Sequence, residues 1–271
     1  MNLIKSLALV GVAATTLFSV QALATPCPTG MQGSPTCIAT TNSYGEPALE
    51  DILGAAGTSG TIFSSGDGIN PYTEQVSPAS YWSVAGTGSS ENKVVLTLTG
   101  SADNLTFGIF DPSNTSNRLM LFDGGDAGYR TSLATDGTGG FGATYYASTD
   151  PLSGPTGHTT TFFGAGNLFG YYLTNGNTTF YSSWMLNGDG TSRVVTYAGD
   201  GKNRVALTNG LFSPGEFLLA WEDGSDFDYN DFVVLVESVH PVPEPAALGM
   251  FGAGILLIGL FAGLRRRSRQ V

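Results

Sequence analysis

Short runs of β-branched and aromatic residues, separated by Gly, Asn and Asp, recur along most of the chain and predict strands joined by turns. Only residues 48–56 have a helical pattern, and glycines end it quickly. Many short strands with such turns favour an all-β fold, an antiparallel β-sandwich of jelly-roll type. The runs expected to form strands are residues 93–99, 105–110, 159–163, 169–173, 178–184, 193–197, 204–207, 217–221 and 232–237.

The hydrophobic segment at the N-terminus has a different pattern. Lys5 precedes an apolar stretch over residues 6–20, and Ala22 and Ala24 supply the small residues of a cleavage site. This order is typical of a secretory signal peptide, here residues 1–24, which is delivered to the secretory translocon and then removed. The mature chain is expected to begin at Thr25.

The C-terminus carries a second apolar run, residues 246–264, followed by an arginine-rich tail. At ~1.5 Å per residue a helix of this length spans roughly 28 Å, close to the ~30 Å hydrocarbon core of a bilayer, so one transmembrane helix is predicted. Cationic flanks stay in the cytoplasm, so residues 265–271 are expected inside the cell and the chain before Pro243 outside it. The arginines are Arg265, Arg266, Arg267 and Arg269.

A Pro-Glu-Pro motif (Pro243, Glu244, Pro245), an apolar helix and an arginine cluster, in this order, resemble the PEP-CTERM sorting tail of Gram-negative bacteria. The resemblance implies that a membrane protease, the exosortase, cuts near the motif and passes the protein towards the cell surface, commonly in organisms that make exopolysaccharide. It implies a single-pass inner-membrane precursor that ends in the envelope, on the outer surface or in the extracellular matrix. An ordinary C-terminal anchor is the alternative.

The net charge limits the binding partners of the exported region, and its two cysteines indicate a disulfide. The exported region, residues 25–244, holds all 22 acids of the chain and only six cations, a net charge of −16. The negative charge disfavours binding to nucleic acid and to anionic lipid head groups, and it favours binding of cations. In an oxidising periplasm, Cys27 and Cys37 are expected to form a short-loop disulfide. A metal site is the weaker alternative for this pair, because no further cysteine or neighbouring histidine completes a ligand set.

The sharpest internal feature is an acidic signature, residues 221–233, without a single cation. Crowded carboxylates repel one another, and Ca²⁺, which takes six to eight oxygen ligands, would offset that repulsion. An EF-hand is excluded, because Asp231 stands where its loop needs glycine and a β-rich run follows. A solvated hairpin turn without metal is the alternative. The candidate calcium ligands are Glu222, Asp223, Asp226, Asp228, Asn230 and Asp231.

The acidic signature also supports a second resemblance. Residues 170–173, 184–190 and 221–233 are similar to the tyrosine-rich strand, the Asn-containing turn and the closing acidic stretch of a domain of unknown function from bacterial surface proteins. The resemblance implies a β fold, an extracellular setting and metal-binding aspartates, and it supplies no activity. The short link from Asp223 to Asp226 leaves open whether both acidic groups reach one ion.

Catalytic motifs are not evident, and an enzyme is not expected. His158 lies in a Gly- and Thr-rich loop, His240 lies among prolines, and no serine has a G-x-S-x-G surrounding. With so many acids, a glycan-cleaving hydrolase is the more remote alternative. The nearer alternative is an exopolysaccharide-binding module with exposed rings. The rings considered are Tyr81, Trp82, Tyr145, Tyr146, Tyr171, Tyr172, Tyr181 and Trp184.

These predictions define an organisation and a function. We expect a non-enzymatic exported protein of the cell surface or extracellular matrix, with a calcium-stabilised sandwich. The expected parts are a signal peptide (1–24), an irregular N-terminal region with the disulfide (25–90), a β-sandwich (91–238), a proline-rich linker (239–245), a transmembrane helix (246–264) and a cytoplasmic tail (265–271).

Overall fold

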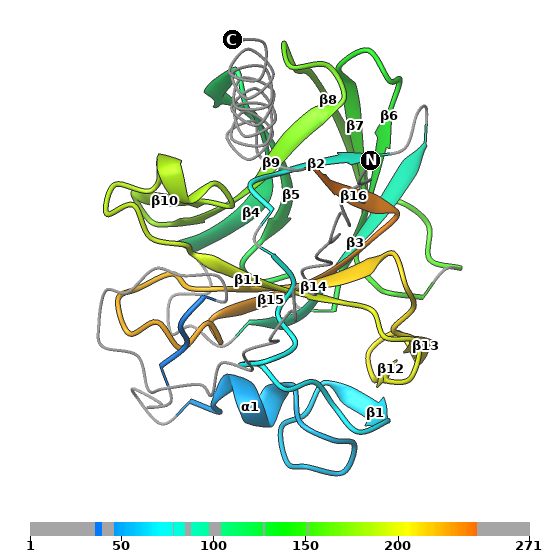
Figure 1. Ribbon diagram of the computed structural model, residues 1–271. Helices are drawn as coiled ribbons and strands as arrows, with labels where there is room; N and C mark the ends of the chain where they lie inside the picture. Colours follow the sequence, from blue (N-terminus) through cyan, green and yellow to red (C-terminus); the bar gives the residue numbers. More distant parts are fainter. Residues whose placement is uncertain are drawn as a thin grey trace, which may run out of the picture.

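The computed structural model describes residues 36–39, 46–77, 79–84, 88–97, 104–126, 128–150 and 152–242 (Figure 1). Several predicted features lie outside these residues and stay predictions here: the signal peptide with Ala22 and Ala24, Cys27 and hence its disulfide with Cys37, the Pro-Glu-Pro motif, the transmembrane helix and the terminal arginines. The described chain is all-β, and its two large sheets are antiparallel throughout, which confirms the predicted class.

A seven-stranded sheet forms the middle layer of the molecule. Its inner hairpin, β14 and β15, pairs in register from Glu216 opposite Glu237 to Trp221 opposite Phe232. In spatial order its strands are β11 (Val194–Ala198), β14 (Glu216–Trp221), β15 (Phe232–Glu237), β3 (Ser89–Thr97), β6 (Arg130–Thr135), β7 (Gly140–Tyr146) and β8 (Gly157–Phe162).

A six-stranded sheet packs on one face of the middle layer, which makes an antiparallel sandwich. The shared core is aromatic: the ring of Phe107 lies 5.4 Å from that of Tyr171 in its own sheet, and 5.9 Å and 5.3 Å from those of Trp221 and Phe232 in the other. The strands are β16 (Val239–Val242), β2 (Tyr81–Val84), β9 (Leu168–Asn175), β4 (Leu105–Asp111) and β5 (Asn114–Asp123), with β10 (Thr178–Tyr181) pairing with β9.

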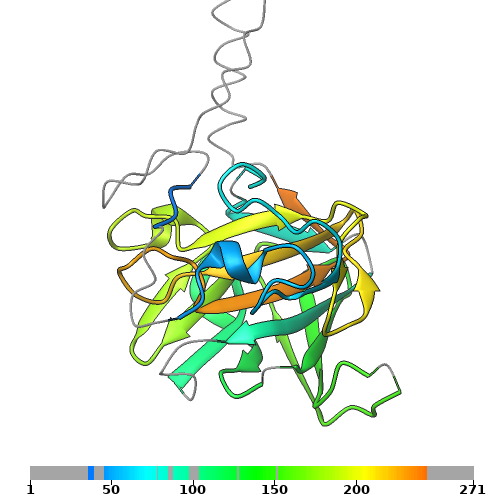
Figure 2. The same ribbon diagram turned by 90° about the horizontal axis from the view of Figure 1, so that it is seen from below.

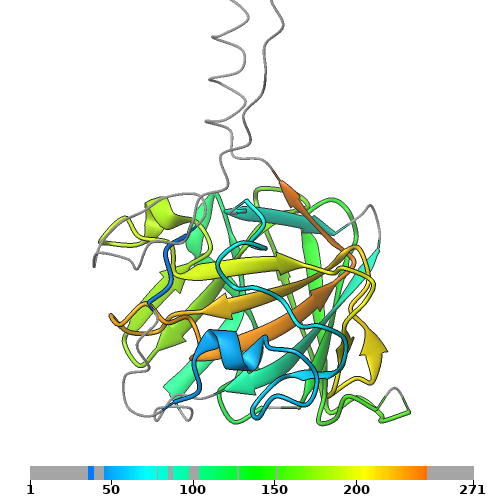
Figure 3. The same cartoon turned by 60° about the horizontal axis from the view of Figure 1, so that its bottom comes forward.

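A third layer covers the other face of the seven-stranded sheet (Figures 2 and 3). It comprises the helix α1 (Leu49–Ile52) and a small sheet of β1 (Phe63–Ser65), β12 (Arg204–Val205) and β13 (Gly210–Leu211). Ile52 and Leu53 belong to one buried apolar cluster with Leu218 and Val233 of the seven-stranded sheet. The hairpin β14–β15 is therefore buried on both faces, which explains its continuous apolar runs.

The predicted strands all occur, and further strands were missed. β6 and β7 were missed because Gly, Ser and Thr break up their apolar positions, and β5 was missed because its first five residues are polar, although residues 119–122 form a continuous apolar run. The sandwich is present, and its jelly-roll type stays a prediction. The expected linker over 239–245 needs correction: its first four residues form β16, which pairs with β2. Ser238, at a φ of 61°, turns the chain out of β15, and Val239 is fully buried in the core.

The central position of Phe107 gives a stability prediction. Because its ring touches aromatic rings of both sheets, Phe107→Ala is expected to lower the free energy of unfolding by about 3–5 kcal/mol. Phe162→Ala removes a ring of the same size that is 62% exposed on the edge strand β8. This control should change the free energy of unfolding by less than ~0.5 kcal/mol. Urea denaturation of both variants measures this; equal losses would contradict the assignment of the core.

Candidate metal site in the acidic loop

The loop that joins β14 to β15 has an unusual backbone. Phe227 and Tyr229 adopt the left-handed conformation, with φ of 60° and 55°, and bulky side chains rarely do so. Contacts of the two rings hold this backbone in place: Tyr229 is buried and its hydroxyl donates to the Ser192 carbonyl oxygen at 2.8 Å, while Phe227 packs beside the Arg193 guanidinium. The acidic residues alternate with these anchored aromatic residues.

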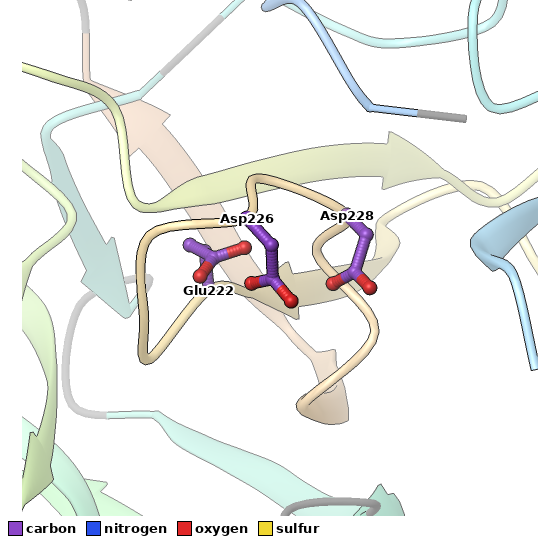
Figure 4. Close-up of side chains that lie close together, drawn as sticks. All are labelled: Glu222, Asp226 and Asp228. Carbon is purple, nitrogen blue, oxygen red and sulfur yellow. The ribbon is translucent and has the colours of Figure 1, made fainter. Parts of the chain in front are cut away.

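Three carboxylates meet in this loop. Oxygen atoms of Glu222, Asp226 and Asp228 all lie within 4.8 Å of one another, and Figure 4 shows Asp226 and Asp228 directed to the same side of the loop. Glu222 is fully buried and Asp228 is 2% exposed. None of the ion pairs in the described part of the chain includes these three residues. Like charges are therefore crowded in a desolvated place, which costs free energy.

Arg193, a cation that contacts the acidic loop, is directed to other partners. The guanidinium of Arg193 donates to the carbonyl oxygen of Gly224 and forms an ion pair with Asp189. Its charge thus fixes the start of the acidic loop to the preceding turn and forms no ion pair with the three carboxylates. Glu222 has only hydrogen bonds from the backbone, to Oε1 from the N–H of Gly224 at 2.8 Å and to Oε2 from the N–H of Tyr229 at 3.4 Å.

Several oxygens at the site are buried without a well-formed hydrogen bond. They are both carboxylate oxygens of Asp228 and the amide oxygen of Asn230, whose residue is fully buried. The amide nitrogen of Asn230 donates to the carbonyl oxygen of Pro47 at 2.9 Å. Buried polar oxygens normally have a hydrogen-bond partner, because an unpaired one loses its hydrogen bonds to water and gains none in exchange. These oxygens are therefore available to a cation.

The pKa values of the buried acids report the same crowding. Burial, and then the charge of Asp226, raises the pKa of Glu222 to about 7. The same two causes raise the pKa of Asp228 to about 6, against the opposing N–H groups of Asn230. Burial and the charge of Asp223 raise the pKa of Asp231 to about 9. Each shift favours the protonated form, and a cation bound by Glu222 and Asp228 would reverse the shifts of these two residues.

The six predicted ligands divide into two groups. Glu222, Asp226 and Asp228 share one place, with Asn230 next in the loop. Asp223 and Asp231 form a second pair, in which the N–H of Asp223 donates to Oδ2 of Asp231 at 2.8 Å. The sequence left open whether the acids on both sides of the short link between Asp223 and Asp226 come together. Glu222 lies with Asp226 and Asp228, whereas Asp223 lies outside this group of three.

Glu46 was missed by the sequence reasoning. Its pKa is raised by burial and by the charges of Asp226 and Asp223, so its carboxylate is close to the acidic loop. The N-terminal segment is fixed there by Ala39, whose N–H donates to the carbonyl oxygen of Phe227 at 2.7 Å, and by the contact of Pro47 with Asn230. No local pattern marks Glu46, because only the third layer of the fold brings it near residues so distant in sequence.

The aromatic residues form no exposed platform in the described part of the chain. Among the eight rings considered, Trp82, Tyr171 and Tyr172 are buried, four are half-buried, and Trp184 alone is exposed. A sugar-binding face needs several exposed rings side by side. His158 lies on the edge strand β8, where its Nδ1 atom hydrogen-bonds the hydroxyl of Thr144 at 3.0 Å.

The family comparison concerns the segment after the sandwich. Residues 241–267 match the family model of the PEP-CTERM protein-sorting motif. The chain carries a PEP-CTERM sorting motif. No curated protein matches the chain. The PEP-CTERM motif confirms the resemblance of the tail and implies an exported protein that exosortase recognises and that is anchored in the membrane before processing. None of the helices among the described residues is long and apolar enough to cross a membrane.

The raised pKa values predict how stability depends on pH without metal. A folded state that holds protons more tightly than the unfolded state loses stability as pH rises through the interval between the two pKa values. With chelator present, the free energy of unfolding should therefore fall between pH 5 and pH 8, through the titration of Glu222 and Asp228. The pKa values of Asp111 and Asp189 are lowered, so these two residues change the free energy of unfolding only below about pH 4, outside the interval of interest.

Urea denaturation at a series of pH values measures this dependence. The double variant Glu222→Gln with Asp228→Asn is the matched comparison, because it keeps the shape of both side chains and removes both titrations. Its profile should be flatter than that of the wild type. A wild-type stability that rises from pH 5 to pH 8 would contradict the assigned burial of these carboxylates.

Proposed function

We propose that the protein is a non-enzymatic component of the cell surface or extracellular matrix, and that Ca²⁺ bound in the acidic loop stabilises its β-sandwich. The ligands would be Glu222, Asp226 and Asp228, with the amide oxygen of Asn230. The observation that carries the proposal is the group of three carboxylates, two of them buried, together with buried oxygens that lack a well-formed hydrogen bond. The established context is an exported, exosortase-sorted chain with a β-rich fold.

The chemistry of these ligands favours calcium over other ions. The ligands are all oxygen atoms, and no histidine or cysteine belongs to the group, so zinc and other metals that select nitrogen or sulfur are disfavoured. Calcium–oxygen bonds are about 2.3–2.6 Å long, so two oxygens across the ion stand roughly 4.6–5.2 Å apart. Oxygens of the three carboxylates lie within 4.8 Å of one another, so one Ca²⁺ can bind all three. Magnesium needs shorter bonds and a stricter octahedron.

Calcium at this place would act on the whole domain. The loop joins β14 to β15, which are buried on both faces, and it holds the N-terminal segment through Asn230 and Phe227. An ion that binds only the folded state stabilises it by about 2.7 kcal/mol when its concentration is 100 times its Kd. The high concentration of calcium outside cells makes even a weak site effective, as in other extracellular modules.

The non-enzymatic part of the proposal is supported by the surroundings of the candidate catalytic groups. His158 is bound to a threonine at a sheet edge, and His240 is exposed on β16. Glu222 and Asp228, whose raised pKa values could suit general acid chemistry, are buried rather than open to a glycan. The exopolysaccharide-binding alternative lacks an observation in its favour, because only Trp184 among the eight rings is exposed.

Thermal unfolding with calcium and with chelator tests the metal. The wild type should gain about 5–10 °C in Tm at a calcium concentration of roughly 100 Kd. Asp228→Asn should lose that gain and yet melt higher than the wild type in chelator, because a buried unpaired charge is gone. Asp51→Asn, an exposed change of equal charge on α1, is the control and should keep the gain. A wild-type Tm that is the same with calcium and with chelator would refute the site.

Replacement of Pro243, Glu244 and Pro245 by alanine tests the sorting step. The precursor should then accumulate in the membrane fraction in its uncut form, because exosortase no longer recognises the motif. Alanine at Asp51, an exposed residue of α1, should leave processing unchanged. Immunoblotting of membrane and extracellular fractions measures both, and normal processing of the triple variant would show that the motif is not used.

A further inference from the structure

Three consecutive apolar side chains stand out on the surface. Trp184, Met185 and Leu186 form the short helix η3 (Trp184–Leu186) and are 41%, 51% and 38% exposed. We call these three residues the η3 knuckle. The other large exposed apolar side chains in the described chain belong to separate strands and loops, such as Phe162 on β8 and Leu211 on β13. A contiguous exposed apolar group of this kind is a candidate contact surface.

The knuckle is held rigidly. Asn187, which follows it, accepts a hydrogen bond from the N–H of Tyr181 at 2.8 Å and donates to the carbonyl oxygens of Tyr181 and Thr191 at 3.1 Å and 2.7 Å. These bonds close the loop around η3 and leave its apolar side chains outside. Because the knuckle is ordered in advance, a partner that covers it gains apolar contact with little loss of conformational entropy.

The end of the sandwich with the knuckle is also where the tail leaves. Val242, the last residue of β16, pairs with Tyr81 of β2. The neighbour of Tyr81, Ser80, accepts a hydrogen bond through its carbonyl oxygen from the hydroxyl of Ser182 at 2.7 Å, two residues before Trp184. In Figures 1 and 3 the η3 coil, which follows β10, and the end of β16 lie on the same side of the domain.

The tail is too short to let this end move far from the bilayer. Pro243, Glu244 and Pro245 alone separate β16 from the apolar run that begins at Ala246. Even fully extended, the chain from Val242 to Ala246 reaches only about 14 Å. The described strand β16 thus removes the longer linker that the sequence suggested. While the precursor is anchored in the membrane, the knuckle is confined near the lipid surface.

We propose that the η3 knuckle inserts into the lipid–water interface while the tail is attached, so that the precursor rests on the bilayer by this end. Tryptophan favours that interface, because its ring is apolar and its N–H can reach water or head groups. Residues 182–192 contain no Lys or Arg, and the exported region is acidic, so the contact is apolar and does not need anionic lipid. The inference rests on membrane anchoring before processing and is independent of calcium.

Cleavage would end this contact. Three apolar side chains form a small surface, and the tail supplies the high effective concentration that keeps them at the membrane. Once exosortase cuts near the motif, the domain loses the tail and the knuckle leaves the lipid. Docking then holds the sorting motif at the membrane surface, where a membrane protease acts, and release follows from the cut itself.

Fluorescence can follow the knuckle directly, because Trp184 is the exposed one of the three tryptophans while Trp82 and Trp221 are buried in the core. The full chain with its tail is reconstituted in phosphatidylcholine vesicles whose acyl chains carry bromine. Most of the Trp184 emission should be quenched by the brominated lipid and protected from iodide in the water. Trp184→Phe gives the background of the two buried rings. A chain that ends at Val242, mixed with the same vesicles, should be quenched by iodide and not by the brominated lipid.

A matched pair of variants separates insertion from mere proximity. Met185→Ser with Leu186→Ser should lower the lipid quenching of Trp184, whereas Leu207→Ser with Leu211→Ser, which are 37% and 41% exposed beside the small third-layer sheet, should leave it unchanged. Iodide quenching that is equal in the anchored and the tail-free chain would overturn the proposal. Protection from iodide without lipid quenching would overturn it too, since it would mean that protein covers the knuckle. Chelator should not alter either result.

Discussion

Repulsion between carboxylates in the loop from β14 to β15 is the constraint around which this structure is arranged. The hairpin that carries the loop is buried on both faces, against the aromatic core on one side and the N-terminal layer on the other. Strands so enclosed cannot shift to relieve strain at their turn. The loop keeps Glu222, Asp226 and Asp228 together because Tyr229, Phe227 and Arg193 fix its backbone, and the charge that results has no counterpart in the described chain.

The same loop links the layers of the molecule. Trp221 and Phe232, which border it, touch Phe107 of the six-stranded sheet. Asn230 and the carbonyl group of Phe227 hold the N-terminal segment, and Glu46 of that segment adds to the negative field. Neutralising the loop would therefore strengthen the contact between parts that are far apart in sequence. An exported protein meets calcium only after translocation, so folding and location would be coupled through this site.

Much of the fold could be predicted from local pattern, and the rest depends on tertiary contacts. The apolar runs of β14 and β15 were recognised because full burial makes them continuous. β7 was missed because partial burial leaves glycine and threonine between its apolar residues, and β5 was missed because its first half is polar. The prolines after Val239 suggested a linker, but an edge strand tolerates Pro241. At the site, composition identified the acidic loop; only the structure separates Asp223 and Asp231 from the other three and brings Glu46 near.

Calorimetric titration of the metal-free exported domain with Ca²⁺ at neutral pH, in two buffers of different ionisation heat, tests the central claim most directly. The buried carboxylates hold protons because their pKa values are raised, and a bound ion must displace them. We expect one ion to bind per chain, with protons released on binding and fewer protons released by the Asp228→Asn variant. An absence of binding heat, or binding of equal strength in that variant, would contradict it.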